Sequence, residues 1–293
     1  MNLLALHPET LRLVAFLGLL GLFALLEHRW PRRPLTVAKG RRWLVNLLIV
    51  AADTLAVRLV VPVVPFAMAA LAAERGWGLF NLVDAGTLVP LVATVLVLDL
   101  VIYAQHRLFH RRVLLWRLHR MHHTDLDLDV STGTRFHPVE ILLSTGIKLV
   151  AVTLIGAPPL AVLVFEILLN GTSLFNHANL RLPAAVDRWL RLVVVTPDMH
   201  RVHHSIIVGE TNSNFGFSLP WWDWLFGSYR AQPRDGHLGM TIGLREWRDP
   251  AELGLWSLLR IPFVNRKPGR TVVPPDLTRV HPSIIVGETN SNF

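Results

Sequence analysis

The chain has 293 residues, of which 17% are charged, 52% are hydrophobic and none is cysteine. Soluble domains carry about 25% charged residues, so this shortfall, with a mean hydropathy of +0.41, predicts a membrane protein. The lack of cysteine excludes disulfides, thiolate metal sites and iron–sulfur clusters. The net charge of +8 lies in short clusters beside apolar runs, which favours cytoplasmic loops and anionic headgroups over nucleic acid as its partners.

Three apolar runs in the first part of the chain predict transmembrane helices. The run 11–26 lacks a preceding positive segment and a good cleavage site, which favours a retained helix over a signal peptide. Residues 28–42 contain six arginines and lysines and no acid, as expected of a cytoplasmic loop. A second helix is expected over 43–73, bent near Pro62 and Pro65. After a short outer loop at 74–86, a third helix over 87–105 returns to the cytoplasm.

The apolar stretch 141–170 is interrupted by Gly156-Ala157-Pro158-Pro159, because each proline removes a backbone donor and restricts the residue before it. Each half has about 15 residues, short of the roughly 20 needed for an upright crossing. A single span would place the histidines before and after it on opposite sides of the membrane. We therefore expect a tight hairpin that enters and leaves on the cytoplasmic side.

From residue 181 the sequence becomes mixed and rich in tryptophan, which predicts a cytoplasmic cap lying on the membrane. Trp221, Trp222, Trp224 and Phe226 suit an interfacial belt or an ordinary aromatic core equally well. The predicted fold is an all-α integral membrane protein. It has three transmembrane helices, a proline-broken membrane hairpin and a cytoplasmic helical cap that carries the histidine clusters.

Three histidine clusters carry the functional prediction. They are His106-x-x-x-His110, His119-x-x-His122-His123 and His200-x-x-His203-His204. Positions i, i+3 and i+4 of a helix share one face, so each cluster is expected to present two or three imidazoles in one direction. Neutral imidazole is a good ligand for first-row metals such as iron. A lone histidine rarely binds metal, but three clusters with this spacing predict a metal site.

His177, which follows the hairpin, is a plausible ninth ligand; the alternative is a histidine hydrogen-bonded at the membrane boundary. Two octahedral ions sharing nine imidazoles keep positions free for dioxygen, whereas a zinc hydrolase usually needs three protein ligands on one ion. The ligand number therefore favours a dinuclear redox site. His137 is either a ligand, a supporting residue or part of a helix start with Pro138, and stays outside the predicted ligand set.

Asp99 is the carboxylate that the pattern singles out. It lies on one face of the third helix with Tyr103, His106 and His110, and a carboxylate at that depth indicates a functional site. We expect it to accept the second N–H of a ligand histidine. The alternative is a buried aspartate hydrogen-bonded to a neighbouring helix.

These motifs resemble the fatty acid hydroxylase/sterol desaturase superfamily over residues 89–230. The resemblance extends to Phe136-His137-Pro138-x-Glu140, Asn176-His177-x-Asn179, Asn214-Phe215-Gly216 and Trp222-Asp223-x-Leu225-Phe226-Gly227. It implies a membrane enzyme with two iron ions that uses dioxygen to hydroxylate or desaturate a lipid. Substrates in the superfamily include sterols, fatty acyl chains, sphingoid bases, alkylglycerols and carotenoids. One departure concerns His177: some relatives carry a histidine four residues earlier, where this chain has Ser173.

The electrons for such a reaction are expected from a separate ferredoxin or small cytochrome with its reductase. The chain has no dinucleotide-binding fingerprint and no haem-attachment motif. A basic rim could dock an acidic donor or anchor the chain at the membrane: Arg107, Arg111, Arg112, Arg117 and Arg120. The composition, rich in arginine, alanine and leucine, favours a bacterial inner membrane.

Three alternative classes compete with the oxygenase. A zinc-dependent membrane hydrolase needs fewer ligands. A divalent-metal transporter needs ligands near the bilayer midplane, whereas these lie at helix ends and in the cap. A haem-binding electron carrier needs only two axial histidines on facing helices.

Residues 279–293 repeat residues 201–215 with a single difference, in which Pro282 stands where the first copy has His204. His200 corresponds to Thr278, so the copy cannot rebuild the cluster, and it is interpreted as a degenerate duplicate. The predicted division of the chain is therefore 1–86 for the N-terminal helices, 87–230 for the di-iron domain and 231–293 for a C-terminal extension.

Overall fold

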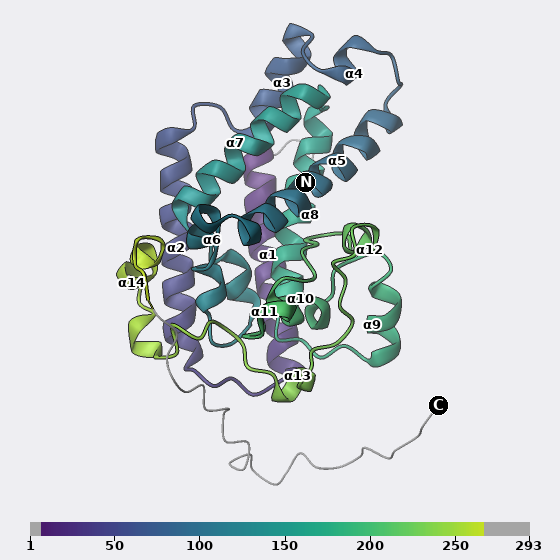
Figure 1. Ribbon diagram of the computed structural model, residues 1–293. Coiled ribbons are helices and arrows are strands. Elements are labelled where there is room, and N and C mark those ends of the chain that lie inside the picture. Colours follow the sequence, from purple (N-terminus) through teal and green to yellow (C-terminus); the bar gives the residue numbers. More distant parts are fainter. Residues whose placement is uncertain (1–6, 267–293) are drawn as a thin grey trace.

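The computed structural model describes residues 7–266, so the duplicated tail lies outside the described residues. Within that range the chain forms helices and two isolated β-bridges. Five stretches are long and apolar enough to cross a membrane (Figure 1): α1 (Pro8–Arg29), Lys39–Leu82, α5 (Leu88–Arg111), α7 (Pro138–Ile155) and α8 (Pro159–His177). The all-α membrane fold is confirmed, and the protein is a multi-pass membrane protein.

The second stretch is divided more strongly than the expected bend. It comprises α2 (Lys39–Val60), α3 (Pro65–Arg75) and the short α4 (Leu79–Leu82). Val61 is extended after α2, and Pro65 opens α3, because proline is tolerated in the first turn of a helix but removes a donor from its interior. The predicted bend near Pro62 and Pro65 is a complete break.

The break between α7 and α8 is confirmed at Gly156, which adopts φ +66° and ends α7, while Pro159 begins α8. A Cβ built on Gly78 would lie 2.2 Å from the Gly156 nitrogen, so the two turns pack backbone against backbone. After the turn the two helices pack against α3 and α5 rather than mainly against each other. The hairpin is therefore open and not tight, because α7 and α8 each pack against α3 and α5.

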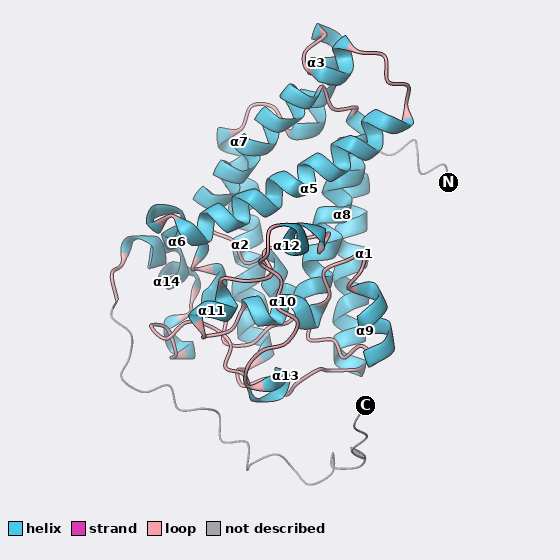
Figure 2. Ribbon diagram, turned by 45° about the vertical axis from the view of Figure 1, so that its right-hand side comes forward, coloured by secondary structure: helices cyan, strands magenta, loops and turns pink. Residues whose placement is uncertain are grey.

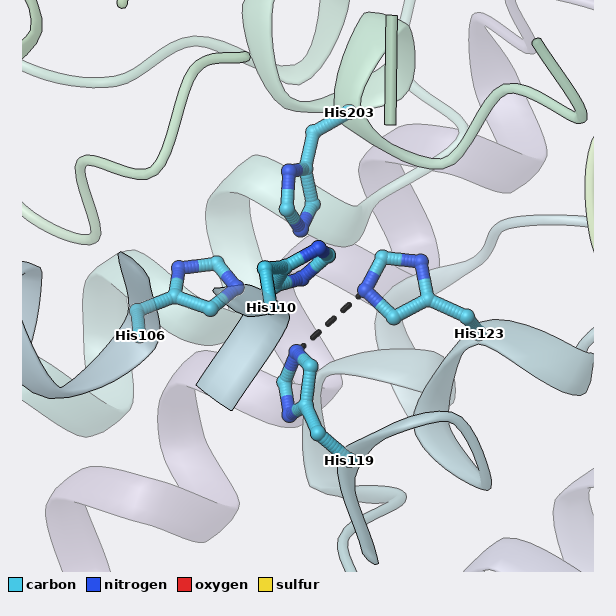
Figure 3. Close-up of side chains that lie close together, drawn as sticks. All are labelled: His106, His110, His119, His123 and His203. Carbon is cyan, nitrogen blue, oxygen red and sulfur yellow. Dashed lines mark hydrogen bonds between the residues drawn. The ribbon is translucent and has the colours of Figure 1, made fainter. Parts of the chain in front are cut away.

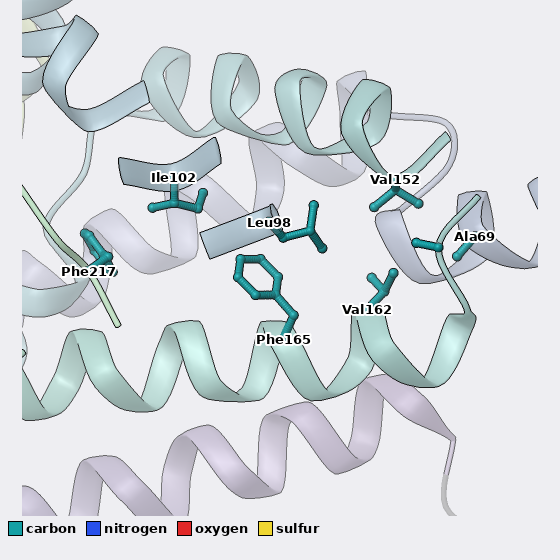
Figure 4. Packing of buried hydrophobic residues seen from close by; sticks show 8 residues of the cluster. Ala69, Leu98, Ile102, Val152, Val162, Phe165 and Phe217 are labelled. Atoms are coloured by element: carbon teal, nitrogen blue, oxygen red, sulfur yellow. The ribbon is translucent and has the colours of Figure 1, made fainter. Parts of the chain in front are cut away.

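A hydrophobic core fills the space between α3, α5, α7 and α8 (Figure 4). Leu98 and Phe165 are almost fully buried there, and Phe217 from the cap joins them at one end. Large apolar side chains such as Leu13 on α1 and Leu59 on α2 are exposed on the outside of the bundle. This outward apolar surface is what a helix facing lipid requires.

The remaining short helices gather at one end of the bundle, opposite α3 (Figure 2). Three of them precede α7: α6 (Val113–His119), η2 (His122–Thr124) and η3 (Val130–Thr134). The others follow α8 and form the cap: α9 (Ala184–Leu190), α10 (Pro197–His203), α11 (Val208–Thr211), α12 (Trp221–Leu225), α13 (Gly236–Gly239), η4 (Pro250–Glu252), α14 (Leu255–Arg260) and η5 (Ile261–Phe263).

Buried ion pairs and hydrogen bonds connect this end to α2 and to the loop that precedes it. Arg42 at the start of α2 contacts Asp125 and Asp129 at 2.8 Å each, and Arg33 donates to the carbonyl oxygens of His237 and Met240. The basic loop 28–42 thus supplies specific partners to the cap. Its cytoplasmic location stays a prediction.

Candidate metal centre

All nine predicted ligand histidines lie at the cap end of the bundle. His106 and His110 come from the last turns of α5, and His177 ends α8. The others come from the α6–η2 segment and from α10 and the residue after it: His119, His122, His123, His200, His203 and His204. Every ring is buried except that of His110, which is partly buried. Segments up to about 100 residues apart in sequence therefore meet at one place.

The nine rings form two groups, and within each group the candidate ligand atoms lie within 4.8 Å of one another. The first group contains five rings, which point toward a common centre (Figure 3): His106, His110, His119, His123 and His203. The second group contains four: His122, His177, His200 and His204. A ligand set for two neighbouring ions is thus assembled, although metal binding itself stays a prediction.

The expectation that each cluster presents two or three imidazoles in one direction is met by the pairs four residues apart, such as His106 and His110, which share the first group. In both H-x-x-H-H motifs the histidines four residues apart share a group, while the middle histidine joins the other group. α6 ends at His119 and the chain continues through the tighter η2 turn, so helical spacing does not hold across the motif. His203, in the last residue of α10, crosses to the first group in the same way. Each motif therefore bridges the two groups.

Hydrogen bonds at the outer nitrogen fix five of the rings. Each Nδ1 contacts a carbonyl or carboxylate oxygen at 2.7–3.1 Å: His106 with Phe215, His119 with Glu140, His122 with Arg135, His177 with Ser173, and His203 with Ser213. Because a carbonyl oxygen only accepts, Nδ1 carries the proton in at least four of these rings. The lone pair of Nε2 is then free to face the group's centre, the usual arrangement of a metal-ligating histidine.

The inner nitrogens fit a bound metal ion. Among residues 7–266, Nε2 of His106, His110 and His203 is buried without a hydrogen-bond partner. In the second group, Nε2 of His177 lies 3.1 Å from Nε2 of both His122 and His200. Several lone pairs that converge in a buried space need a cation to satisfy them.

The local electrostatics favour the neutral form of these imidazoles. Burial, and secondarily the neighbouring imidazoles, lower the pKa of His200, His203 and His204 well below the usual value. Burial likewise lowers the pKa of His119 to about 3. The imidazoles are therefore neutral near pH 7, which is the form that ligates metal.

The expected contact of Asp99 with a histidine is wrong. Its Oδ2 accepts from the Trp222 indole at 2.8 Å and from the Leu219 amide at 3.2 Å, and its buried Oδ1 has no hydrogen-bond partner among the described residues. Asp99 lies nearly two turns before His106 on α5, so it reaches the cap segment that crosses the helix rather than a ligand. Asp99 therefore connects α5 to α12 through its hydrogen bond with Trp222.

Glu140 has the role that was expected of Asp99. It lies in the first turn of α7, and its Oε1 is 2.7 Å from Nδ1 of His119. The signal was present in the His137-Pro138-x-Glu140 motif, because a proline-opened helix directs its first-turn side chains toward the preceding segment. His137 itself accepts from the Val139 amide and so caps α7, and it belongs to neither histidine group. This agrees with the alternative of a helix start.

Ser173, at the position where some relatives carry histidine, supports the second group indirectly. Its hydroxyl donates to the Gly133 carbonyl at 2.7 Å, and its own carbonyl accepts from His177. The second group therefore has four histidines against five in the first.

A cavity of about 670 Å³ opens beside the first group, between α1, α2, α5, α7 and α8. His106, His119 and Glu140 line it, as do the aromatic rings of Phe136 and Phe217. Cavities that bind small ligands have about 300–1,000 Å³. The cavity therefore extends from the interior of the helix bundle to the histidines of the first group.

Residues 91–228 match the model of the fatty acid hydroxylase family. Relatives include the ornithine lipid hydroxylase OlsE of Rhizobium tropici, 33% identical over 48% of this chain and 42% of its own length. Methylsterol monooxygenase 2-2 of Arabidopsis thaliana is 25% identical over 46% of this chain and 50% of its own length. Human cholesterol 25-hydroxylase is 29% identical over 46% and 49%, respectively. No solved structure matches the chain significantly.

The matched region contains all nine grouped histidines and Glu140. This part of the chain carries a fatty acid hydroxylase domain, and it is similar to lipid and sterol hydroxylases and monooxygenases. The chain spans about half the length, or less, of the curated relatives named above.

Proposed function

We propose that this protein is a membrane di-iron oxygenase that hydroxylates or desaturates a C–H bond of a lipid. The observation that carries the proposal is the pair of buried histidine groups, the first of which adjoins a cavity between membrane-length helices. Relatives named as lipid and sterol hydroxylases and monooxygenases support the reaction class. The domain proposed to hold the site is 87–230, preceded by the helices of 1–86.

Two iron ions, held by the five and the four histidines, would supply the activation of dioxygen with electrons from a separate donor. The protein's own groups prepare the site for this chemistry. The carbonyl and carboxylate partners hold five of the nine rings in the tautomer that presents the lone pair inward. Phe136 stacks on the ring of His122 at 4.5 Å between centroids, and with Phe217 it forms an apolar wall that limits water beside the reacting carbon.

The electron donor is proposed to be a ferredoxin or small cytochrome that approaches from the cytoplasm. In the basic rim, Arg117 and Arg120 donate to backbone carbonyls of residues 261–264. Arg111 and Arg112 are exposed. The last two are therefore the arginines of the rim that remain available for an acidic partner.

Metal content of the detergent-purified protein tests the proposal. We expect about two iron ions per chain in the wild type, a loss of iron in His200→Ala, and no loss in His28→Ala, which changes an exposed histidine outside both groups. Protein with iron, a reductase system and a bacterial lipid extract should then incorporate one atom of ¹⁸O from ¹⁸O₂ into a lipid, or form an alkene. Stoichiometric zinc after iron-replete expression, or no bound metal, would overturn the proposal.

A further inference from the structure

The cavity that reaches the histidines has a charged end within the helix bundle. Glu166 on α8 is 2% exposed and lies 3.0 Å from Arg12 on α1 and 3.5 Å from Lys148 on α7. Asp53 on α2 is buried, and its Oδ1 has no hydrogen-bond partner in the described part of the chain. All four side chains line the cavity. Ionisable residues within membrane-spanning segments are costly and indicate a functional site.

The two walls of this end carry opposite excess charge. On one wall Arg12 and Lys148 share a single carboxylate, so one positive charge remains, and the Arg12 Nε is buried without a partner in the part of the chain described. On the other wall Asp53 forms no ion pair within residues 7–266, and its Oδ1 lacks a hydrogen-bond partner there. A bound group that completes both walls needs an ammonium for Asp53 and an anion for Arg12 and Lys148. Glu9 and Arg58, both exposed, also line the cavity, and together they add no net charge to its lining.

Two residues of the charged end, Lys148 and Glu166, lie far from the histidines along their helices. On α7 the cavity is lined by Glu140, Ser144 and Lys148, which repeat every four residues on one helix face, so Lys148 lies about 12 Å along the helix from Glu140. On α8, Glu166 lies roughly 16 Å along the helix from His177. Ile141, Leu169 and Leu174 line the interval, together with the uncharged polar side chains of Thr145, Asn170 and Ser173. The cavity thus has ionisable side chains at both ends and uncharged side chains between them.

We propose that this charged end binds the headgroup of a zwitterionic lipid, with its ammonium on Asp53 and its carboxylate or phosphate on Arg12 and Lys148. The apolar chain then extends along the cavity, and a carbon remote from the headgroup meets the histidine groups. The inference deepens the proposed function and rests on it for the position of oxidation. The headgroup enters near the start of α1 and the end of α2, which are the ends of these helices remote from the histidines.

Lipid selectivity of the purified full-length chain tests the headgroup site without any turnover. Native mass spectrometry would compare lipids with matched acyl chains: phosphatidylethanolamine and an N-acyl amino acid with a free amine, against phosphatidylglycerol and diacylglycerol. We expect at least about tenfold stronger binding of the amine-bearing zwitterions, because each charge-assisted contact contributes on the order of one tenfold step. The two zwitterions distinguish phosphate from carboxylate as the anion. Equal binding of all four lipids would overturn the site.

Variants on the two walls separate the contacts. Asp53→Asn should lower binding of phosphatidylethanolamine about tenfold and leave phosphatidylglycerol unchanged, whereas Lys148→Gln should weaken both. Glu74→Gln, an exposed carboxylate that does not line the cavity, is the matched control. Iron content measured on the same samples reports folding. If a variant loses iron, the headgroup site is judged from the wild type's selectivity among the four lipids alone.

The position of the product oxygen tests the chain's orientation. Tandem mass spectrometry of an oxidised zwitterionic lipid should place the new oxygen or double bond on the acyl chain, away from the headgroup. Oxygen on the headgroup would overturn this orientation. Selective binding without any oxidation would keep the headgroup site and refute the oxygenase, so the two failures are distinguishable.

Discussion

Removing the carboxylate of Glu140 should weaken one of the two metal sites and spare the other. Its Oε1 is 2.7 Å from Nδ1 of His119, and both side chains are buried. Glu140→Ala leaves that ring nitrogen unpaired, which costs about 1–3 kcal/mol. Since 1.4 kcal/mol is a tenfold change in affinity, iron in the first group should bind about 10–100-fold more weakly, the range typical of partners that orient a ligand histidine.

The second group has no contact with Glu140 through its own histidines, so its iron should remain. Under competition with a chelator, the variant should fall from about two iron ions per chain to about one, while the wild type retains both. Glu140→Gln keeps an oxygen acceptor at the same position and should lose less than a tenfold step of affinity. Iron would be measured by elemental analysis after timed exposure to the chelator.

Asp99→Asn is the matched control, because Asp99 is a buried carboxylate on a neighbouring helix that contacts Trp222 and no histidine. It should keep both iron ions. Retention of two irons with unchanged kinetics in Glu140→Ala, or an equal loss in Asp99→Asn, would refute the assignment of the supporting role to Glu140.

Three further predictions concern stability; the first two are measured by thermal unfolding in detergent and the third by the yield of folded protein. Arg42→Met leaves two buried aspartates without their cation and should destabilise the protein by about 3–5 kcal/mol; the exposed Arg41→Met should change little, and equal effects would contradict the ion-pair argument. Burial lowers the pKa of His237 to about 4, so the unfolded chain binds more protons between pH 6.5 and 4 and stability should fall as the pH is lowered through that window; His237→Gln should flatten this slope relative to the wild type, and an unchanged slope would refute it. Gly78→Ala places a Cβ against the backbone of the α7–α8 turn and should lower folded yield strongly, whereas Gly18→Ala, which meets open space, should be tolerated; similar yields would show that the two turns do not pack closely.

Local sequence rules predicted the helices well where the signal was local. Apolar runs of membrane length, and prolines at positions 62, 65, 158 and 159, set where helices run and end, because hydropathy and the missing proline donor act within a few residues. The relative placement of α7 and α8 depends instead on side chains of α3 and α5. No pattern within residues 141–170 encodes those distant contacts.

The histidine motifs show the same division. Their spacing singled out the nine residues that the structure brings together, since a run of imidazoles has few structural uses. The spacing could not predict how the rings are shared between two groups, because that depends on the end of α6 at His119 and on the η2 turn after it. It also favoured Asp99 over Glu140, because Asp99 shares a helix with two ligands whereas Glu140 reaches His119 from another element.

The sequence by itself determined the membrane class and the nine histidines that form the two groups, and it indicated the superfamily, because composition and short motifs report the chemistry that a chain can perform. Only the tertiary structure decided which carboxylate supports the histidines, how the rings divide, and that Asp53, Glu166, Arg12 and Lys148 line one cavity. These four residues come from four helices and are up to 154 positions apart. Their meeting is a property of helix packing, and packing joins residues that no local pattern connects.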